Sequence, residues 1–90
     1  ARVMMRLSQA DELKKGDILI ARTTMPPWTP LFAVAGAIVV ETGGILSHAA
    51  VTAREYGIPA VMGIAGATRT IRDGQLLEVD GTEGTVRLLP

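Results

Sequence analysis

The chain has 90 residues, of which 48% are hydrophobic, and this length suits one domain with a modest core. Nine basic side chains balance nine acidic ones, which argues against a nucleic-acid or membrane-surface partner. The chain has no cysteine and one histidine, which excludes a disulfide, a thiolate metal site and a histidine-rich one. We therefore predict a single domain over residues 1–90, cytoplasmic and with no metal of its own.

The first segment of the chain predicts a short helix followed by a strand. Ser8 is a suitable N-cap and Gly16 a suitable residue just past the end, with two lysines in the last turn, so we expect a helix between them. The apolar segment 17–21 follows directly and predicts a buried strand.

The proline-rich segment 25–30 predicts a rigid loop, because each proline fixes its own φ angle. Trp28 in this loop is expected to pack onto the sheet. We expect Thr29 to cap a short helix that begins at Pro30, since proline suits the first helical position.

The middle of the chain has the pattern of strand, helix and strand. Segment 37–41 is apolar almost without alternation, which is typical of a strand covered on both faces. Segment 48–56 predicts a helix that Gly57 ends, and 59–64 predicts a second buried strand. We expect these strands to be neighbours in one sheet, with the helix as their crossover.

The last part of the chain predicts a β-hairpin, because segments 74–80 and 85–89 alternate partly around a glycine-bounded turn. Together the elements predict an α/β fold, with a mixed sheet, short helices packed on it and a C-terminal β-hairpin.

The only histidine, His48, stands where the middle helix begins, after Gly43, Gly44 and Ser47. The glycines allow a sharp turn and close approach of a ligand, and the first amides of a helix lack partners within it. Such an end favours a phosphate and disfavours a charged imidazole, so a neutral His48 can attack phosphorus there. Ser47 can cap the helix or orient a ring nitrogen.

Each of these residues also has a purely structural interpretation. A lone histidine at a helix start is often structural or exposed, and a glycine pair often forms a simple strand-to-helix turn. Arg54 lies about 120° around the helix from His48 by helical periodicity, which suits a solvated flank as well as a phosphate contact. The residues alone leave both interpretations open.

Residues 43–61 follow, almost throughout, the pattern Gly-Gly-x-x-Ser/Thr/Cys-His-x-x-x-x-Ala-Arg-x-x-x-x-Pro-Ala. In this pattern the sequence resembles the mobile, phosphohistidine-carrying domain of phosphoenolpyruvate-utilising enzymes, the family of phosphoenolpyruvate synthase, pyruvate phosphate dikinase and rifamycin phosphotransferase. The resemblance implies the swivelling β/β/α fold and a phosphoryl group carried on His48 between two active sites. It also implies that Ser47 assists the histidine and that Arg54 contacts the phosphate at some stage.

The same resemblance implies that the chain is a fragment of a larger phosphotransferase. An ATP-grasp nucleotide-binding domain and an acceptor domain for pyruvate or another substrate are then expected on other segments or chains. Magnesium and ATP or phosphoenolpyruvate would bind to those domains and not to this one, so the isolated domain is not expected to turn over substrate. Two alternatives stay open: a free-standing phosphocarrier that is phosphorylated in trans, and a non-catalytic interaction module on the same fold.

Overall fold

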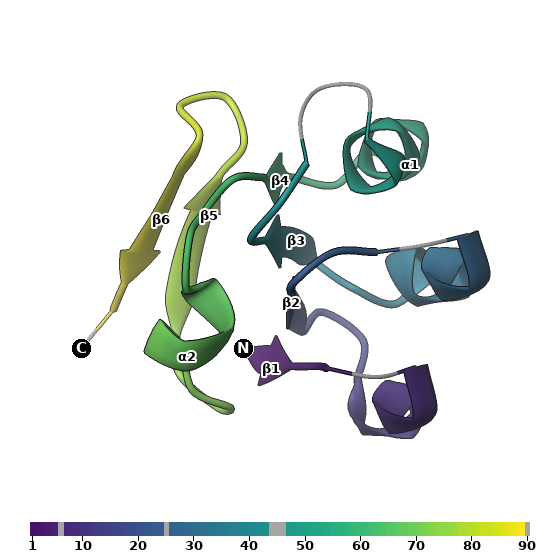
Figure 1. Cartoon of the computed structure of the whole chain (residues 1–90), viewed down its shortest axis with the longest axis horizontal. Coiled ribbons are helices and arrows are strands. Elements are labelled where there is room, and N and C mark those ends of the chain that lie inside the picture. The colour runs from purple at the N-terminus through teal and green to yellow at the C-terminus, as the bar shows by residue number, and fades with distance from the viewer. Residues whose placement is uncertain (6, 25, 44–46, 90) are drawn as a thin grey trace.

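Short strands alternate with short helices along most of the chain, and a β-hairpin follows them (Figure 1). The computed structural model describes residues 1–5, 7–24, 26–43 and 47–89. In chain order the elements are β1 (Arg2–Val3), the 3₁₀ helix η1 (Leu7–Glu12), β2 (Ile18–Ala21), the 3₁₀ helix η2 (Pro26–Ala33), β3 (Ala37–Val40), α1 (His48–Tyr56), β4 (Ala60–Val61), α2 (Ala67–Thr70), β5 (Leu77–Asp80) and β6 (Thr85–Leu88).

The first four strands form one parallel sheet in the order β1, β2, β3, β4. The pairing of β2 with β3 runs from Ile18 opposite Ala37 to Ala21 opposite Val40. β3 and β4 are parallel neighbours on either side of α1 in the sequence, which confirms the predicted crossover arrangement. Because the strands are parallel and in this register, the segments that follow β2 and β3 begin at the same edge of the sheet.

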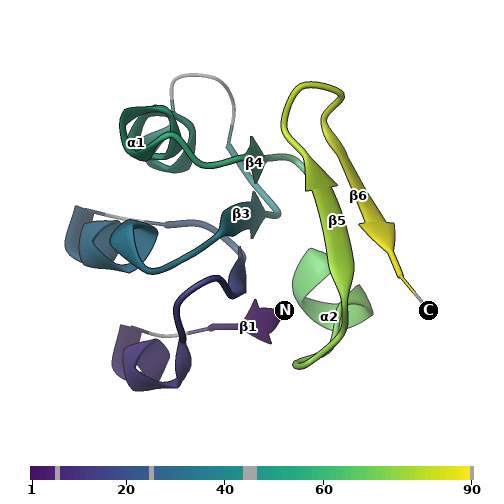
Figure 2. The same ribbon diagram turned by 180° about the vertical axis from the view of Figure 1, so that it is seen from behind.

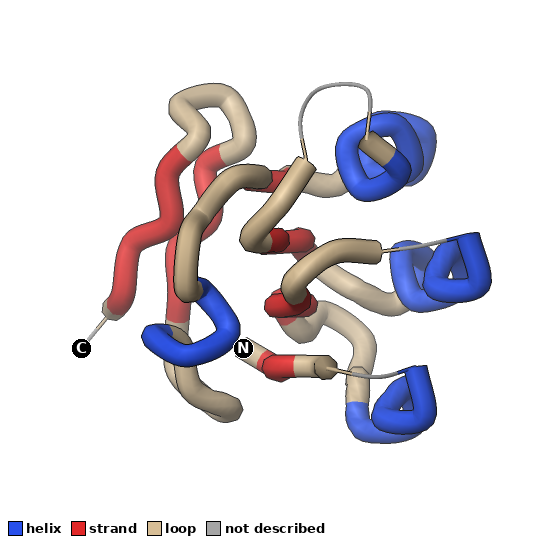
Figure 3. Tube along the Cα trace, viewed as in Figure 1, coloured by secondary structure: helices blue, strands red, loops and turns tan. Residues whose placement is uncertain are grey.

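Both faces of the parallel sheet are covered, as the near-continuous apolar sequence of its central strands predicts. η1, η2 and α1 lie along one face, and α2 and the hairpin lie on the other (Figures 1 and 3). Successive side chains of a strand point to opposite faces, so the core has two parts. The helix-side cluster includes Leu19, Ala21, Ile38, Val40 and Phe32, and the hairpin-side cluster includes Ile20, Val39, Ala67 and Ile71.

The predicted C-terminal hairpin is confirmed. β5 and β6 pair antiparallel, with Leu77 opposite Leu88 and Asp80 opposite Thr85. Seen from behind, the hairpin stands beside α2 on the side of the sheet away from α1 (Figure 2). Parallel and antiparallel pairing therefore both occur in this α/β fold, and they occur in separate sheets.

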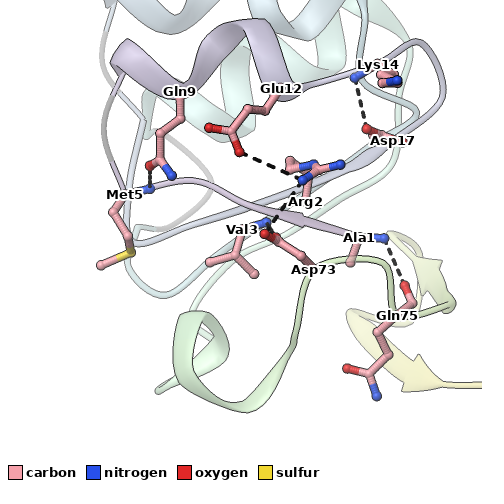
Figure 4. A network of polar contacts seen from close by, with 10 residues as sticks. All are labelled: Ala1, Arg2, Val3, Met5, Gln9, Glu12, Lys14, Asp17, Asp73 and Gln75. Carbon is pink, nitrogen blue, oxygen red and sulfur yellow. Dashed lines mark hydrogen bonds and ion pairs between the residues drawn. The ribbon is translucent and has the colours of Figure 1, made fainter.

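Polar contacts fasten the edge strand β1 to two other parts of the chain (Figure 4). The Arg2 guanidinium lies 3.8 Å from the Glu12 carboxylate of η1 and 3.7 Å from the Asp73 carboxylate. The backbone N–H of Val3 donates to Asp73 Oδ1 at 2.6 Å. β1 is thus held by these polar contacts to η1 and Asp73 as well as by its pairing with β2.

Two of the expected helices differ from the observed ones. The helix expected from Ser8, whose side chain lies outside the described residues, is the 3₁₀ helix η1 and ends at Glu12. Its continuation is replaced by a turn, in which Asp17 Oδ2 accepts the Lys14 N–H that an α-helix would use, at 2.9 Å. η2 begins at Pro26 and not at Pro30, because the prolines at its start preset a helical φ, and Thr29 therefore lies inside a helix instead of capping one.

The strand expected over 59–64 is also shorter, with only Ala60–Val61 in β4. Gly63 has φ +78°, a left-handed conformation that no continuing strand adopts.

Gly16 and Gly36 bring the start of β2 against the connection between η2 and β3. The Gly16 N–H donates to the Val34 carbonyl at 2.9 Å, and the Gly36 N–H donates to the Asp17 carbonyl at 2.8 Å. A Cβ atom on Gly36 would lie 2.8 Å from the Gly16 carbonyl oxygen. Only a residue without a side chain fits at this backbone crossing.

We therefore expect Gly36→Ala to lower the free energy of unfolding by roughly 1–3 kcal/mol, the usual cost of overpacking against atoms that cannot move away. Urea unfolding followed by circular dichroism measures this change. Lys15→Ala, which also introduces an alanine at this crossing but at an exposed position, should stay within about 0.5 kcal/mol of wild type. Equal stability of the Gly36→Ala variant and wild type would contradict the packing described here.

Candidate functional site

α1 begins and ends where the sequence predicts, and its first turn is capped by Ser47. The cap has an extended backbone, with φ −71° and ψ 162°, and its Oγ accepts the Ala50 N–H at 3.3 Å. The Ser47 carbonyl accepts the Val51 N–H at 3.0 Å. Of the two roles considered for Ser47, the structure shows the cap. At the other end Gly57 adopts a left-handed conformation with φ 69°.

Gly43 shapes the turn that leads into this helix. Its φ is +108°, and a Cβ atom at this position would lie 2.9 Å from Ser47 Oγ. A side chain here would therefore press on the group that caps α1. Gly44, the second glycine of the pair, lies outside the described residues.

His48 is the first residue of α1, and its half-buried ring is bonded through both nitrogens. Nδ1 lies 2.8 Å from the Thr24 hydroxyl, and Nε2 lies 3.0 Å from the Thr29 hydroxyl. The rings of Phe32 and His48 form a T-shaped pair, with a centroid distance of 5.7 Å and an interplanar angle of 82°. The ring is therefore held between the carboxyl end of β2 and η2 by neutral groups.

Thr24 and Thr29 are the site residues that the sequence analysis missed. They lie 24 and 19 residues before His48, so no local pattern links them to it. One signal was available: Thr24 follows the predicted strand 17–21, and residues after parallel strands gather at one edge of the sheet. Thr29 offered none, because its hydroxyl was assigned to a helix cap.

Arg54 lies on another side of α1 from the ring of His48. Its exposed side chain lines a hollow of about 270 Å³ between α1, β4 and the turn of the hairpin, together with Ala50, Ala53, Ala60, Met62 and Gly81. The His48 ring faces η2 instead. A contact between Arg54 and a phosphate stays a prediction.

Glu41 fixes the strand end from which the glycine turn departs. Glu41 Oε2 accepts hydrogen bonds from the Thr68 hydroxyl and from the Thr68 N–H, the latter at 2.8 Å. These two bonds hold the pKa of the Glu41 carboxyl below its usual value of 4.5. Burial opposes them with a smaller effect, and the charges of Arg22 and Arg69 lower the pKa slightly further. The ionised carboxylate therefore ties the start of α2 to the end of β3.

The described residues contain no group of three or more histidine, aspartate or glutamate side chains placed to hold a metal ion. Within the same described ranges, no helix has both the length and the apolar character that crossing a membrane requires.

Comparison with known proteins gives a consistent result. Residues 13–84 match the sequence profile of the family described as PEP-utilising enzyme, mobile domain. The chain is 58% identical over 89 residues to a chondramide synthase of Chondromyces crocatus, and 51% identical over 89 residues to a rifampicin phosphotransferase of Streptomyces sviceus. Both alignments cover 99% of this chain, but the chain spans only 2% and 10% of the length of these relatives.

The fold is similar to that of a solved structure as well. A solution NMR structure of an Enzyme I protein superimposes with a TM-score of 0.76 and 34% sequence identity. The similarity covers 90% of this chain and 34% of the Enzyme I chain.

The contacts of Glu41 predict a pH dependence of stability. Because the pKa of Glu41 is lowered in the folded chain, its ionised form contributes stability above about pH 4.5, and this contribution is lost as the pH falls through the lowered value. We expect Glu41→Gln to be less stable than wild type at about pH 7 and to approach wild type at about pH 3. Urea unfolding at both pH values measures the difference in unfolding free energy between the variant and wild type.

Glu55→Gln is the matched control, since it makes the same substitution at an exposed position of α1 without touching the bonds to Thr68. If the free energies of unfolding of wild type and Glu41→Gln differ by the same amount at both pH values, the ionised Glu41 carboxylate is not the source of the stability.

Proposed function

This chain belongs to the mobile-domain family of phosphoenolpyruvate-utilising enzymes, and on that premise we propose that it is the phosphohistidine carrier domain of a phosphotransferase. His48 accepts a phosphoryl group at one active site and delivers it at another. The observation that carries the proposal is the placement of the chain's single histidine as the first residue of α1, next to the cap Ser47, with its ring bonded to two hydroxyls.

The start of α1 suits a phosphoryl group for a physical reason. Ser47 satisfies the amides of Ala50 and Val51, whereas the amides of His48 and Ala49 have no partner among the described residues. Unpartnered amides and the positive end of the helix dipole favour an anion within the first turn. A phosphoryl group on His48 therefore lies in a field that stabilises it.

A neutral imidazole is a competent nucleophile toward phosphorus, and phosphoryl transfer depends mainly on positioning and on neutralising charge. This chain supplies the nucleophile and its orientation. The magnesium ion and the ATP or phosphoenolpyruvate that the chemistry requires would be bound by an ATP-grasp domain and an acceptor domain. The relatives have ample additional length for such domains, since the chain spans 10% of the rifampicin phosphotransferase.

Within this proposal the remaining site residues have distinct roles. Gly43 keeps side-chain atoms away from the Ser47 cap, Gly44 stays a predicted glycine of the turn, and Arg54 contacts the phosphate at one of the two active sites. The parent enzyme is of the pyruvate, water dikinase or rifamycin phosphotransferase type. The isolated chain carries the phosphoryl group but turns over no substrate.

Phosphorylation of the chain tests this function directly. Incubation with the donor domains of a rifampicin phosphotransferase and with ATP labelled on its outer phosphates should place an acid-labile, alkali-stable phosphate on wild type. His48→Ala should show no label, because the chain has no other histidine. Its circular dichroism spectrum should match that of wild type, which shows that the fold is intact. Undiminished labelling of His48→Ala would refute the carrier role, as would unlabelled wild type in the presence of donor domains shown to be active.

Variants of Ser47 separate capping from charge. Ser47→Ala removes the cap and should cost roughly 0.5–2 kcal/mol of unfolding free energy, with labelling slowed but not abolished. Ser47→Asn and Ser47→Asp both restore a cap, so both should recover stability. Only Ser47→Asn should recover the labelling rate, since the carboxylate of Ser47→Asp repels a phosphoryl donor. Equal labelling of the two capped variants would contradict a phosphate at the start of α1.

A further inference from the structure

We propose that a small apolar pocket beside His48 is a docking pocket for the phosphoryl-donating domain, and that it takes an apolar side chain of that domain with a carboxylate next to it. This inference rests on the proposed function, which requires a donor domain to reach His48 but does not say what holds it there. The pocket has a volume of about 170 Å³ and is lined by Met4, Met5, Arg22, Thr23 and Trp28.

The pairing of the first two strands explains why this pocket forms. β1 and β2 are parallel neighbours, so the segments that follow them leave the sheet at the same edge. The two methionines follow β1, and Arg22 and Thr23 follow β2. Trp28 of η2 supplies the last wall. Crevices outside the carboxyl ends of parallel strands are the usual ligand sites of open α/β sheets.

The pocket lies next to the histidine. Thr23 precedes Thr24, whose hydroxyl lies 2.8 Å from a ring nitrogen of His48. Trp28 precedes Thr29, whose hydroxyl lies 3.0 Å from the other ring nitrogen. A domain that brings a phosphoryl group to His48 therefore comes against this part of the surface, which is why we assign the pocket to the donor domain.

The walls of the pocket are mainly apolar. Met4 is fully buried in the helix-side cluster, and the half-buried Trp28 packs against that cluster. Met5 is 46% exposed. A methionine adapts its shape to a neighbour, and an indole offers a large rigid face. An incoming apolar side chain therefore finds one adaptable wall and one rigid wall, and it buries apolar area against both.

Arg22 gives the pocket its charge. Its side chain is exposed and makes no ion pair among the described residues. Arg22 acts on the Glu41 carboxyl through its charge alone, and that carboxylate is bonded to Thr68. A carboxylate beside the apolar side chain of the partner would supply an ion pair for Arg22. Such complementarity mainly orients the partner and speeds its association.

Labelling by two phosphoryl donors separates docking from the reactivity of His48. The donor domains of a rifampicin phosphotransferase, supplied with labelled ATP, must dock, whereas phosphoramidate, a small phosphoryl donor, need not. At donor-domain concentrations well below saturation, Arg22→Gln should lower the ratio of the two labelling rates about fivefold, the scale of one exposed ion pair. Met5→Ser removes apolar area and should lower the ratio by a similar factor. Saturating donor domains should restore the ratio in both variants.

Matched controls carry the same substitutions on the hairpin side of the sheet. Arg72→Gln, just after α2, and Leu76→Ser, just before β5, change exposed residues and should keep the wild-type ratio. If the donor domains label wild type and the ratio is unchanged in Arg22→Gln and Met5→Ser, the docking pocket is refuted and the carrier function stands.

Trp28 reports directly on occupancy of the pocket, because it is the only tryptophan of the chain. 5-Fluorotryptophan in its place gives one ¹⁹F resonance, which unlabelled donor domains should shift or broaden. Added salt should weaken this effect more in wild type than in Arg22→Gln, since salt screens the ion pair that the variant lacks.

The same resonance identifies any other occupant. A shift caused by ATP alone would assign the pocket to the nucleotide, and a shift that depends on the concentration of the chain itself would assign it to a second copy. Either result, or no shift on addition of active donor domains, would overturn the docking proposal. A shift by the donor domains without any labelling of His48 would instead contradict only the carrier function.

Discussion

The parallel pairing of β2 with β3 is the constraint on which the site depends. Its register ends both strands together, at Ala21 and Val40. The two segments that follow these strands remain paired for a further residue or two. The Glu41 N–H donates to the Ala21 carbonyl and the Thr42 N–H donates to the Arg22 carbonyl, each at 3.1 Å. Thr24 and the turn that leads to His48 therefore start from one place. A shift of this register would separate the hydroxyl from the ring.

The burial of this pair of strands is what fixes the register. Ile20 and Val39 belong to the hairpin-side cluster, and Ile38 and Val40 to the helix-side cluster. A slip by one residue would turn each of these side chains toward the opposite cluster, where it would no longer fit. The two core clusters thus act at a distance on the site, since they hold the strand ends from which its residues emerge.

The sequence predicts those parts of the molecule that depend on neighbouring residues. The bounds of α1, its serine cap and its terminal glycine follow from local capping rules, and they agree with the structure. The expected strand over 17–21 and the hairpin were likewise confirmed. The segments that differ are those in which a side chain or a proline competes for backbone groups, as Asp17 does at the end of η1.

The immediate partners of the histidine could not be predicted in the same way. Thr24 and Thr29 reach the ring only because the sheet and η2 fold back on α1. Thr29 lies in the predicted proline-rich loop, and Thr24 lies just before it. Nothing in a threonine's own sequence context distinguishes a hydroxyl that bonds an imidazole from one that caps a helix. The position of His48 at the start of α1 could therefore be predicted from the sequence, whereas the hydrogen-bond partners of its ring could not.

Under the proposed carrier function His48 would both accept and release a phosphoryl group, and the neutrality of its partners matters for both steps. Among the described residues, the groups bonded to the ring are hydroxyls, and no charged side chain bonds to it. A carboxylate at the ring would repel an incoming phosphate, and a fixed cation would hold the phosphoryl group after transfer. Hydroxyls instead donate or accept as the ring changes state. In the proposed function the charges that drive transfer in either direction would then belong to the two active sites that the carrier serves, so that each active site, and not the carrier, would decide the direction of transfer.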